Sequence, residues 1–397
     1  MELMPGYNKH SDVGVIPDDW VIKQLQEVSD PVRGGSPRPA GDPRFFDGSF
    51  IPWLTVAALT SISDSQLVVT ETATNLTEEG SKRSRTLSPG TLIIANSGAT
   101  LGVAKILGMK CCANDGIAAL LNVDEQVSSE YLAHYINTKT IYLREVVATG
   151  NGQPNLNTGL IGSFRLPLPP TRAEQEEISQ ALSDVDELLI ALDQMIAKKR
   201  DLKQAAMQQL LTGDIQLSGF NKKWLEMPLG EIVKPQKGQL ITTKTIVPGD
   251  IPVIAGGKQP AYFHASANRY GKTITVSASG ASAGYVAFHA APIFASDCST
   301  IGESEKYCIE FIYYALQLRQ EEIYAAQTGG AQPHIQPKDL APILIKIPED
   351  VTEQAAIASV LSDMDAEITE LKSRRDKTHN LKQAMMQELL TGKTRLV

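Results

Sequence analysis

Two segments of the sequence carry apolar residues at alternating intervals of three and four positions, the spacing that places them on one face of an α-helix. The series are Leu182, Val185, Leu189, Leu192 and Ile196 in the first segment, and Leu361, Met364, Ile368 and Leu371 in the second. Polar residues fill most of the intervening positions. Each segment therefore predicts a long helix with one narrow apolar seam, as in a coiled coil.

Both predicted helices carry start and stop signals. A capping-box pattern, in which two side chains three residues apart satisfy free backbone amides, opens each segment. A glycine follows the last apolar residue, where a left-handed conformation commonly ends a helix. The signals are Thr171, Glu174 and Gly213 in the first segment and Asp350, Glu353 and Gly392 in the second. They predict helical regions over residues 169–213 and 348–397.

The two helical segments are copies of one another. The run LKQAAMQQLLTG at residues 202–213 returns as LKQAMMQELLTG at residues 381–392, an offset of 179 positions. Roughly half of the positions between residues 174 and 213 are identical in the second copy, more than a shared heptad pattern produces. If the helices pack together they run antiparallel, since a domain follows the first helix but not the second. Lys199, Arg375 and Thr378 interrupt the seam and predict a polar middle.

The segments before the two helices also correspond. The strand-like run at residues 91–95 matches residues 273–277, and a Ser-Gly-Ala turn follows in both copies. Short strands, turns rich in Gly and Pro, and one helical stretch indicate an α+β domain over residues 1–168 and another over residues 214–347. The predicted fold is two similar α+β domains separated by two long antiparallel helices, with a pseudo-two-fold internal repeat.

Composition narrows the class of protein. The chain of 397 residues is 42% apolar and 21% charged, which is ordinary for a globular protein. Its four cysteines lack the spacing of a zinc site or disulfide framework. Its first residues do not resemble a signal peptide, and no apolar run reaches the length of a membrane span, so we expect a cytoplasmic protein without membrane contact.

Charge argues against a simple non-specific DNA-binding protein. The formal net charge is −8, whereas such proteins usually carry a basic excess that displaces counterions from phosphates. A local basic cluster softens this argument and is a candidate for phosphate contacts; it comprises Lys82, Arg83 and Arg85. The alternative interpretation is that the cluster is an ordinary solvated surface.

Several motifs occur in the same order in both halves. The first half contains RGGSP at residues 33–37, IPW at 51–53, NSGATLG at 96–102 and NDGIA at 114–118; the second contains GASAGYV at 280–286, ASDC at 295–298 and GGAQPHI at 329–335. Together with the duplicated Leu-Leu-Thr-Gly helices, they resemble the specificity subunits of type I restriction-modification systems over nearly the whole chain. The second half departs from this pattern at its opening, where Lys237-Gly238-Gln239 replaces a Gly-Gly-Ser-Pro motif.

The resemblance implies a division of labour. Each domain is then a target recognition domain that reads one half of an asymmetric, bipartite site in double-stranded DNA, with the helices acting as a ruler. It also implies two modification subunits, which bring S-adenosylmethionine, and restriction or translocase subunits, which bring ATP and Mg. The chain itself is expected to be a non-catalytic recognition subunit without a cofactor or metal.

Candidate DNA contacts are loop residues whose side chains match base edges, such as Arg for guanine and Asn or Gln for adenine. They are Arg33, Ser36, Arg38, Asn151, Gln153 and Asn155 in the first domain, and Gln239, Lys258, Gln332, His334 and Gln336 in the second. For each, the alternative is a loop residue that only satisfies its own backbone. Candidate docking positions for partner subunits lie on the helices: Leu182, Val185, Leu189, Leu192, Leu202, Leu361, Met364, Ile368, Leu371 and Leu381.

Two other functional classes remain open at this point. One is a coiled-coil scaffold that binds proteins without reading DNA, and the other is an enzyme that acts alone. The Gly-Lys-Thr runs at residues 271–273 and 392–394 resemble the end of a phosphate-binding loop, but Ser266 and Gln387 stand where the motif requires glycine. The sequence therefore favours chemistry supplied by partners.

Overall fold

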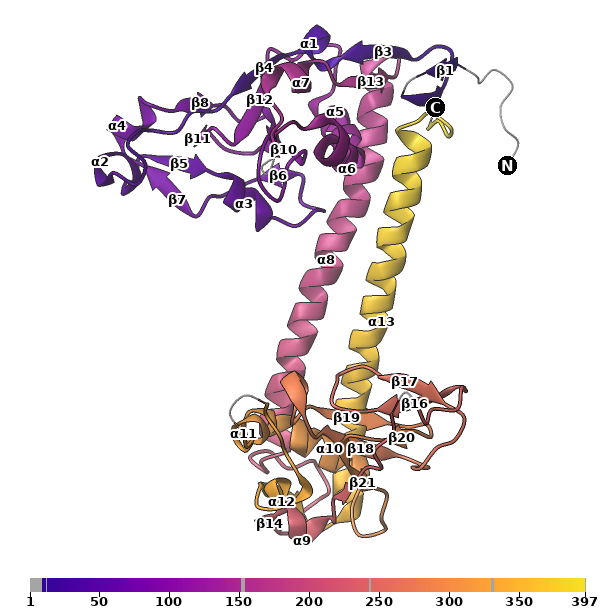
Figure 1. Cartoon of the computed structure of the whole chain (residues 1–397). Coiled ribbons are helices and arrows are strands. Elements are labelled where there is room, and N and C mark those ends of the chain that lie inside the picture. The colour runs from indigo at the N-terminus through magenta and orange to yellow at the C-terminus, as the bar shows by residue number, and fades with distance from the viewer. Residues whose placement is uncertain (1–8, 12, 151–153, 243, 330–331, 397) are drawn as a thin grey trace. The chain divides into compact units, whose positions relative to one another are not determined.

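The computed structural model describes residues 9–11, 13–150, 154–242, 244–329 and 332–396. It divides into two compact units (Figure 1). Unit 1 combines residues 1–194 with residues 372–397, and unit 2 comprises residues 195–371. Each unit contains one globular domain and parts of both long helices.

Two sheets form the domain of unit 1. The five-stranded sheet has the order β4 (Asp30–Arg33), β12 (Ile117–Leu121), β9 (Leu92–Ala95), β10 (Ala104–Leu107) and β6 (Val68–Val69), in which only β10 and β6 run parallel. The four-stranded sheet has the order β7 (Thr74–Leu76), β5 (Ile51–Leu54), β11 (Cys111–Ala113) and β8 (Arg85–Leu87). Two antiparallel pairs join β13 (Arg165–Leu168) to β3 (Val21–Gln24) and β1 (Lys9–Ser11) to β2 (Gly14–Ile16).

Short helices surround these sheets. They are α1 (Leu25–Val28), α2 (Pro43–Phe46), α3 (Val56–Thr60), α4 (Glu78–Ser81), α5 (Ser129–Thr138), α6 (Thr140–Tyr142), a π-helix over Leu143–Val147, and α7 (Thr158–Gly162). Successive side chains of β9 point to opposite faces of the five-stranded sheet, and both faces are covered. Leu92 and Ile94 pack in the core that contains α5, whereas Ile93 packs in a second apolar cluster.

The domain of unit 2 repeats this arrangement with one strand fewer in each of its two sheets. Its main sheet has the order β15 (Gln236–Lys237), β21 (Cys298–Gly302), β18 (Thr273–Ser277) and β19 (Val286–His289), and its second sheet has the order β17 (Tyr262–His264), β16 (Ile251–Ile254) and β20 (Phe294–Ala295). The pair β14 (Trp224–Pro228) and β22 (Leu344–Pro348) takes the place of β3 and β13. The helices are α9 (Leu229–Ile232), a 3-10 turn over Gly280–Ser282, α10 (Ile309–Leu318), α11 (Gln320–Ala325) and α12 (Pro337–Leu340). The predicted α+β repeat is therefore confirmed.

The two long helices are α8 (Arg172–Leu210) and α13 (Val351–Leu389). In unit 1, Lys382 Nζ lies 2.6 Å from Asp186 Oδ1, and Arg375 pairs with Asp193. In unit 2, Lys203 Nζ lies 2.6 Å from Asp365 Oδ1, and Lys199 pairs with Glu367. Rising numbers on one helix meet falling numbers on the other, so the helices pack antiparallel within each unit, as predicted.

The Asp–Lys pairs are equivalent positions of the repeat, because the offset of 179 converts Asp186 into Asp365 and Lys203 into Lys382. In the first pair the Lys382 and Asp186 side chains are only 14% and 7% exposed. Burial raises the pKa of Asp186, and the Lys382 ammonium opposes that shift. The carboxylate of Asp186 therefore depends on Lys382 to remain charged inside the protein.

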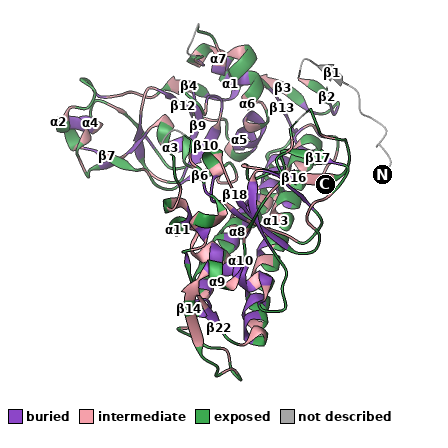
Figure 2. Ribbon diagram, turned by 60° about the horizontal axis from the view of Figure 1, so that its bottom comes forward, coloured by how far each residue is buried: buried purple, intermediate pink, exposed green. Residues whose placement is uncertain are grey.

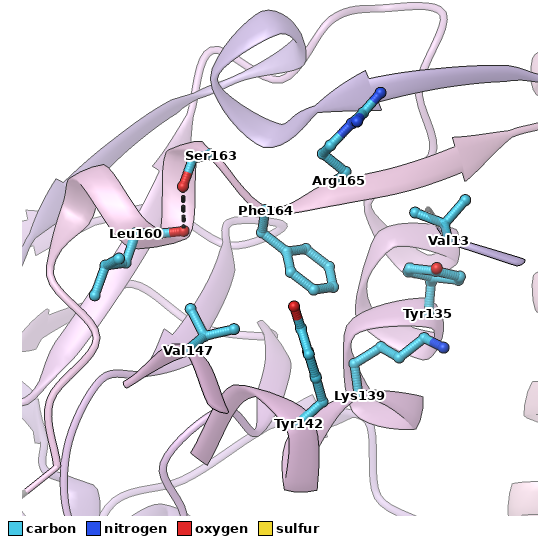
Figure 3. Close-up of a pocket in the computed structure, with 9 residues that line it drawn as sticks. All are labelled: Val13, Tyr135, Lys139, Tyr142, Val147, Leu160, Ser163, Phe164 and Arg165. Atoms are coloured by element: carbon cyan, nitrogen blue, oxygen red, sulfur yellow. Dashed lines mark hydrogen bonds between the residues drawn. The ribbon is translucent and has the colours of Figure 1, made fainter. Parts of the chain in front are cut away.

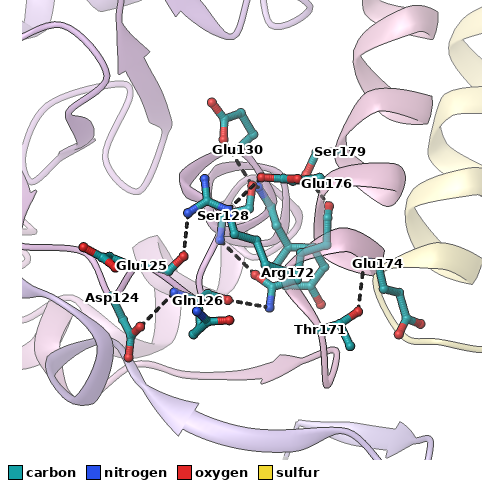
Figure 4. A network of polar contacts seen from close by, with 12 residues as sticks. Asp124, Glu125, Gln126, Ser128, Glu130, Thr171, Arg172, Glu174, Glu176 and Ser179 are labelled. Carbon is teal, nitrogen blue, oxygen red and sulfur yellow. Dashed lines mark hydrogen bonds and ion pairs between the residues drawn. The ribbon is translucent and has the colours of Figure 1, made fainter.

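The start of each long helix is bound to its own domain by the same Glu-Gln dipeptide. Gln175 accepts a hydrogen bond from the Ser128 amide (2.9 Å), and its counterpart Gln354 accepts one from the Cys308 amide (2.9 Å). The neighbouring carboxylates of Glu174 and Glu353 are buried. Figure 4 shows how the first turn of α8, with Arg172, lies beside the loop that ends at Ser128. Each helix is thus fixed to a domain by buried polar contacts.

A buried position on the helix that packs against each long helix differs between the two units. His134 on α5 is buried within 3.5 Å of the Ser183 hydroxyl, and Tyr314 occupies the corresponding position on α10. Tyr314 donates to the Asp365 carboxylate (2.9 Å), and Lys203 lies over its ring. Burial lowers the pKa of His134 to about 3, with the charges of Lys382 and Lys105 adding to the effect. His134 is therefore neutral in the folded protein.

We predict that replacing Lys382 by methionine lowers the free energy of unfolding by about 3–5 kcal/mol, because the buried Asp186 loses its counterion. Adding Asp186→Leu to this variant should recover most of the loss. Urea unfolding measures both effects. The control is Lys82→Met, which breaks the exposed pair with Glu78 and should leave stability nearly unchanged. Equal stability of Lys382→Met and the control would refute the role of the buried pair.

A second prediction concerns acid. The unfolded chain binds a proton at His134 near pH 6.5, whereas the folded chain does so only near pH 3, so this residue destabilises the fold increasingly as pH falls below 6.5. His134→Gln should flatten the decline in unfolding free energy between pH 6 and pH 4.5 by about 1 kcal/mol per pH unit. His379, which is exposed on α13, provides the control through His379→Gln. The same slope in both variants would contradict the assignment.

Candidate nucleic-acid interface

Three of the predicted contact residues in the first domain gather around one turn, which joins β11 to β12 and carries Asp115. The Ser36 hydroxyl donates to Asp115 Oδ1 (2.7 Å), and Arg38 Nη2 lies 3.4 Å from Asp115 Oδ2. Arg33 Nε donates to the Asp115 backbone oxygen (2.6 Å). The hydrogen bond from Ser36 lowers the pKa of Asp115, and the charges of Arg33 and Arg38 act in the same direction. The turn therefore holds two exposed guanidinium groups around an ionised carboxylate.

Backbone packing explains why a glycine precedes this cluster. A Cβ atom on Gly34 would lie 2.1 Å from the Asn114 carbonyl oxygen, so no other residue fits without movement of the backbone. The Gly34 amide donates to the Ile117 carbonyl oxygen (2.8 Å). This close approach brings the loop after β4 onto the Asp115 turn.

The basic cluster divides into two parts. Arg85 belongs to the turn, because its Nε donates to the Arg33 carbonyl oxygen (2.7 Å). Lys82 pairs with Glu78 at 2.9 Å, and Arg83 pairs with Glu79 at 3.6 Å. The carboxylates of Glu78 and Glu79 offset the charges of Lys82 and Arg83. Arg85 is therefore the member of the cluster that adds positive charge beside Arg33.

One further candidate that the structure describes, Asn155, lies in the loop before α7. Asn155 is half-buried and forms β-bridges with Ser97 and Thr149. Asn151 and Gln153 lie outside the described residues, so their predicted contacts stay predictions. The structure thus brings Arg33, Ser36 and Arg38 together and places Asn155 against the neighbouring Ser97.

The second domain builds a corresponding turn between β20 and β21, which carries Asp297. Gly238 repeats the role of Gly34, because a Cβ atom there would lie 2.1 Å from the Ser296 carbonyl oxygen. The Ser279 hydroxyl donates to Asp297 Oδ2. A cavity of about 330 Å³ opens beside the turn; its lining includes Lys237, Ser279, Asp297, Ser299, His334 and Gln336.

The predicted contacts of the second domain fall at two places. His334 and Gln336 line the Asp297 cavity. Gln332 is exposed two residues before His334. The Gln239 amide donates to the Ala295 carbonyl oxygen next to the turn. Lys258 instead lines a separate cavity of about 280 Å³, where its ammonium lies 5.4 Å from the centre of the Tyr285 ring. The structure therefore does not join Lys258 to the Asp297 group.

Comparison with known proteins decides the family. The family model for the type I restriction modification DNA specificity domain matches residues 17–203 and, a second time, residues 221–378. The chain belongs to this family.

Individual relatives agree with the family match. The chain is 23% identical to the putative type I restriction enzyme MjaX specificity subunit of Methanocaldococcus jannaschii, over 98% of this chain and 96% of that protein. It is 27% identical to the MjaIX specificity subunit of the same organism, over 58% of this chain but only 55% of that relative's length. The crystal structure of a type I restriction-modification S subunit from M. genitalium has a TM-score of 0.69 at 15% identity, over 98% of both chains, and so shares the fold.

Two residues at the centre of this specificity-domain repeat were missed by sequence reasoning. Asp115 and Asp297 each lie inside a motif that occurs in both halves, but neither was considered as a contact residue. The available signal was the recurrence of an aspartate in the same turn of two domains whose other loop residues differ. Lys237 and Ser299 were missed as well, and only the strand pairing brings them to the cavity.

The helix positions proposed for partner docking fall into two groups. Five are buried in the structure: Leu182, Leu189, Leu192, Leu361 and Ile368. Val185, Met364 and Leu371 are half-buried. Leu202 and Leu381 are 47% and 54% exposed and are equivalent positions of the repeat. These two leucines are the members of the set that a partner can reach without disrupting the fold.

A further cavity of about 460 Å³ lies in unit 1, away from the Asp115 turn (Figure 3). Aromatic and aliphatic side chains line it, among them Tyr135 on α5, Tyr142 on α6, Leu160 on α7 and Phe164 just after α7. The Ser163 hydroxyl donates to the Leu160 carbonyl oxygen (3.1 Å), as expected for a residue at a helix end.

Within the part of the chain that the structure describes, no group of three or more His, Cys, Asp or Glu residues is arranged to hold a metal ion. Across the same residues, no helix has the length and apolar character needed to span a membrane.

Proposed function

We propose that the chain is the recognition subunit of a type I restriction-modification complex and reads an asymmetric, bipartite sequence in double-stranded DNA. The observation that carries this proposal is that one fold occurs twice and presents unlike polar side chains around the same turn. In the first domain Arg33 and Arg38 surround Asp115, whereas in the second His334 and Gln336 lie beside Asp297. Two similar domains with different reading groups suit two half-sites of different sequence.

The chemistry of these groups fits the edges of bases. A guanidinium group donates two hydrogen bonds to the O6 and N7 atoms of guanine, and an amide side chain matches adenine. Arg33, Arg38 and Arg85 are exposed and close enough to act on one stretch of major groove. Because the chain carries a formal net charge of −8, we propose that partner subunits supply many of the phosphate contacts.

Catalysis belongs, in this proposal, to other chains. Two modification subunits would supply S-adenosylmethionine and transfer the methyl group, and restriction or translocase subunits would supply ATP and Mg. The specificity chain would hold the DNA and the modification subunits together in the cytoplasm. Its symmetric helices offer two equivalent positions, Leu202 and Leu381, on which two copies of one partner can dock.

DNA reading is tested by selecting from a library with two randomised blocks, using the chain assembled with its modification subunit. We predict enrichment of two blocks of different sequence. Arg33→Ala or Arg38→Ala should lower the preference at positions of one block by about ten- to a hundredfold, about 1–3 kcal/mol, and leave the other block unchanged. Arg172→Ala, which removes an exposed arginine from α8, is the control. A complex that binds without sequence preference would instead support a protein scaffold.

Docking generates a separate prediction. A glutamate at position 202 or 381 places an unpaired charge in the proposed apolar contact, so each single variant should bind one modification subunit instead of two, and the double variant none. Native mass spectrometry counts the bound copies. Leu344→Glu, at an equally exposed site on β22, should bind two. If both single variants keep two copies, the subunits dock elsewhere.

A further inference from the structure

The Asp297 cavity contains a buried hydroxyl group without a partner. Ser299 is 1% exposed and lines the cavity, and its Oγ atom has no hydrogen-bond partner in the structure. A buried polar group left unsatisfied costs free energy, and such groups in native proteins commonly await a ligand or water. The unpaired hydroxyl therefore points to a polar ligand atom in this cavity.

The equivalent position in the first domain is apolar. Ser299 lies opposite Lys237 and Val276 in the sheet of unit 2, and Ala118 lies opposite Arg33 and Ile94 in the sheet of unit 1. The register of the two sheets thus pairs Ser299 with Ala118. The hydroxyl belongs to the second domain alone, as expected for a group that serves specificity and not the shared fold.

The two aspartates differ in how far the protein already satisfies them. Asp115 accepts hydrogen bonds from Ser36 and Arg38. In the residues that the structure describes, the one donor to the Asp297 carboxylate is Ser279, and it acts on Oδ2. Leu240 stands at the position that corresponds to Ser36, and its side chain is 75% exposed. Asp297 Oδ1 is therefore left as a free acceptor at the cavity.

We propose that this cavity receives the exocyclic amino group of a base in the second half-site, that is, the N6 group of adenine or the N4 group of cytosine. Both groups are hydrogen-bond donors in the major groove and suit a carboxylate acceptor. The Ser299 hydroxyl offers a second acceptor for the same amino group. Asp297 and Ser299 are then specificity-determining residues, an assignment that rests on the proposed reading of DNA.

Neighbouring groups support a base over a phosphate. The Asp297 carboxylate repels phosphate oxygens, and it equally disfavours the O6 atom of guanine and the O4 atom of thymine. The Gln336 side chain lines the same cavity, and its NH₂ group is a donor that suits the N7 atom of a purine. Lys237 lines the same cavity. Its positive charge suits a DNA phosphate group next to the base that the cavity receives.

The test uses the assembled complex and a duplex of the sequence that the wild-type complex selects. Single adenines are replaced by purine, and single cytosines by 2-pyrimidinone, because these analogues lack the amino group. One replacement in the second half-site should weaken wild-type binding by ten- to a hundredfold. The type of base that responds identifies adenine or cytosine as the source of the amino group.

Variants then connect that amino group to the cavity. The Asp297→Ala complex should bind the analogue and the natural duplex within about twofold of each other, and Ser299→Ala should show a smaller loss of discrimination. Asp250→Ala, which removes an exposed carboxylate of the second domain outside this cavity, is the control and should keep the full discrimination in the second half-site. Preference for the first half-site, measured on the same samples, reports that the variants are folded.

The outcomes separate this inference from the proposed function. If Asp297→Ala discriminates against the analogue as the wild type does, or if no amino group in the second half-site matters to the wild type, the inference is overturned while DNA reading stands. If the wild-type complex selects no sequence at all, the proposed function itself fails.

Discussion

An ion pair between Asp and Lys, which occurs once in each unit and is buried in unit 1, is the interaction on which the arrangement of this chain depends. Asp186 with Lys382 and Asp365 with Lys203 join α8 to α13 once in each unit, at positions that the repeat makes equivalent. Asp186 and Lys382 are only 7% and 14% exposed, so a shift in helix register would leave both charges buried without a counterion. The pairs therefore fix both the antiparallel direction and the register, more strictly than an apolar seam alone.

The same two sites join the helices to the domains. Tyr314 donates to Asp365 and lies beneath Lys203, and His134 occupies the corresponding place on α5, where it lies near Ser183. Figure 2 shows that burial is concentrated where α10 and the strands of each domain meet the helices, whereas the outer loops are exposed. Several contacts recur in both copies, among them the Asp–Lys pairs and the hydrogen bonds of Gln175 and Gln354, whereas the polar groups around the two turns differ. Such a scaffold permits the reading groups of one domain to change without loss of the fold.

Much of this organisation could be predicted from the sequence, because a repeat and a helical period are properties of spacing. The two long helices, their antiparallel packing and the repeated α+β domains are confirmed. Leu202 shows where spacing stops being sufficient: Lys203 takes the inward position next to it by pairing with Asp365, and Leu202 is left exposed. Sequence pattern does not reveal which long-range ion pair replaces an apolar contact. The role of the helices as a ruler stays a prediction.

The reading groups were harder to identify, since they meet only after the strands pair. Arg33, Ser36 and Arg38 were predicted and do lie together, but the Asp115 turn that organises them is about 80 residues away in the sequence. Lys258 was grouped with His334 because both are polar loop residues, yet they line different cavities. A functional role for Ser299 could not be predicted from the sequence. A serine in a buried strand becomes a candidate only when the residues that line the same cavity, Asp297 among them, are known.

Carbodiimide cross-linking of the purified full chain tests the central claim most directly, because this reagent joins a carboxylate to an amine only when the two are already in contact. Mixing isotopically light and heavy chains distinguishes links within one chain from links between chains. We predict links within one chain from Asp186 to Lys382 and from Asp365 to Lys203. Links from Lys203 to Glu388 or from Lys382 to Asp201, which a parallel pairing of the helices would produce, would contradict the account.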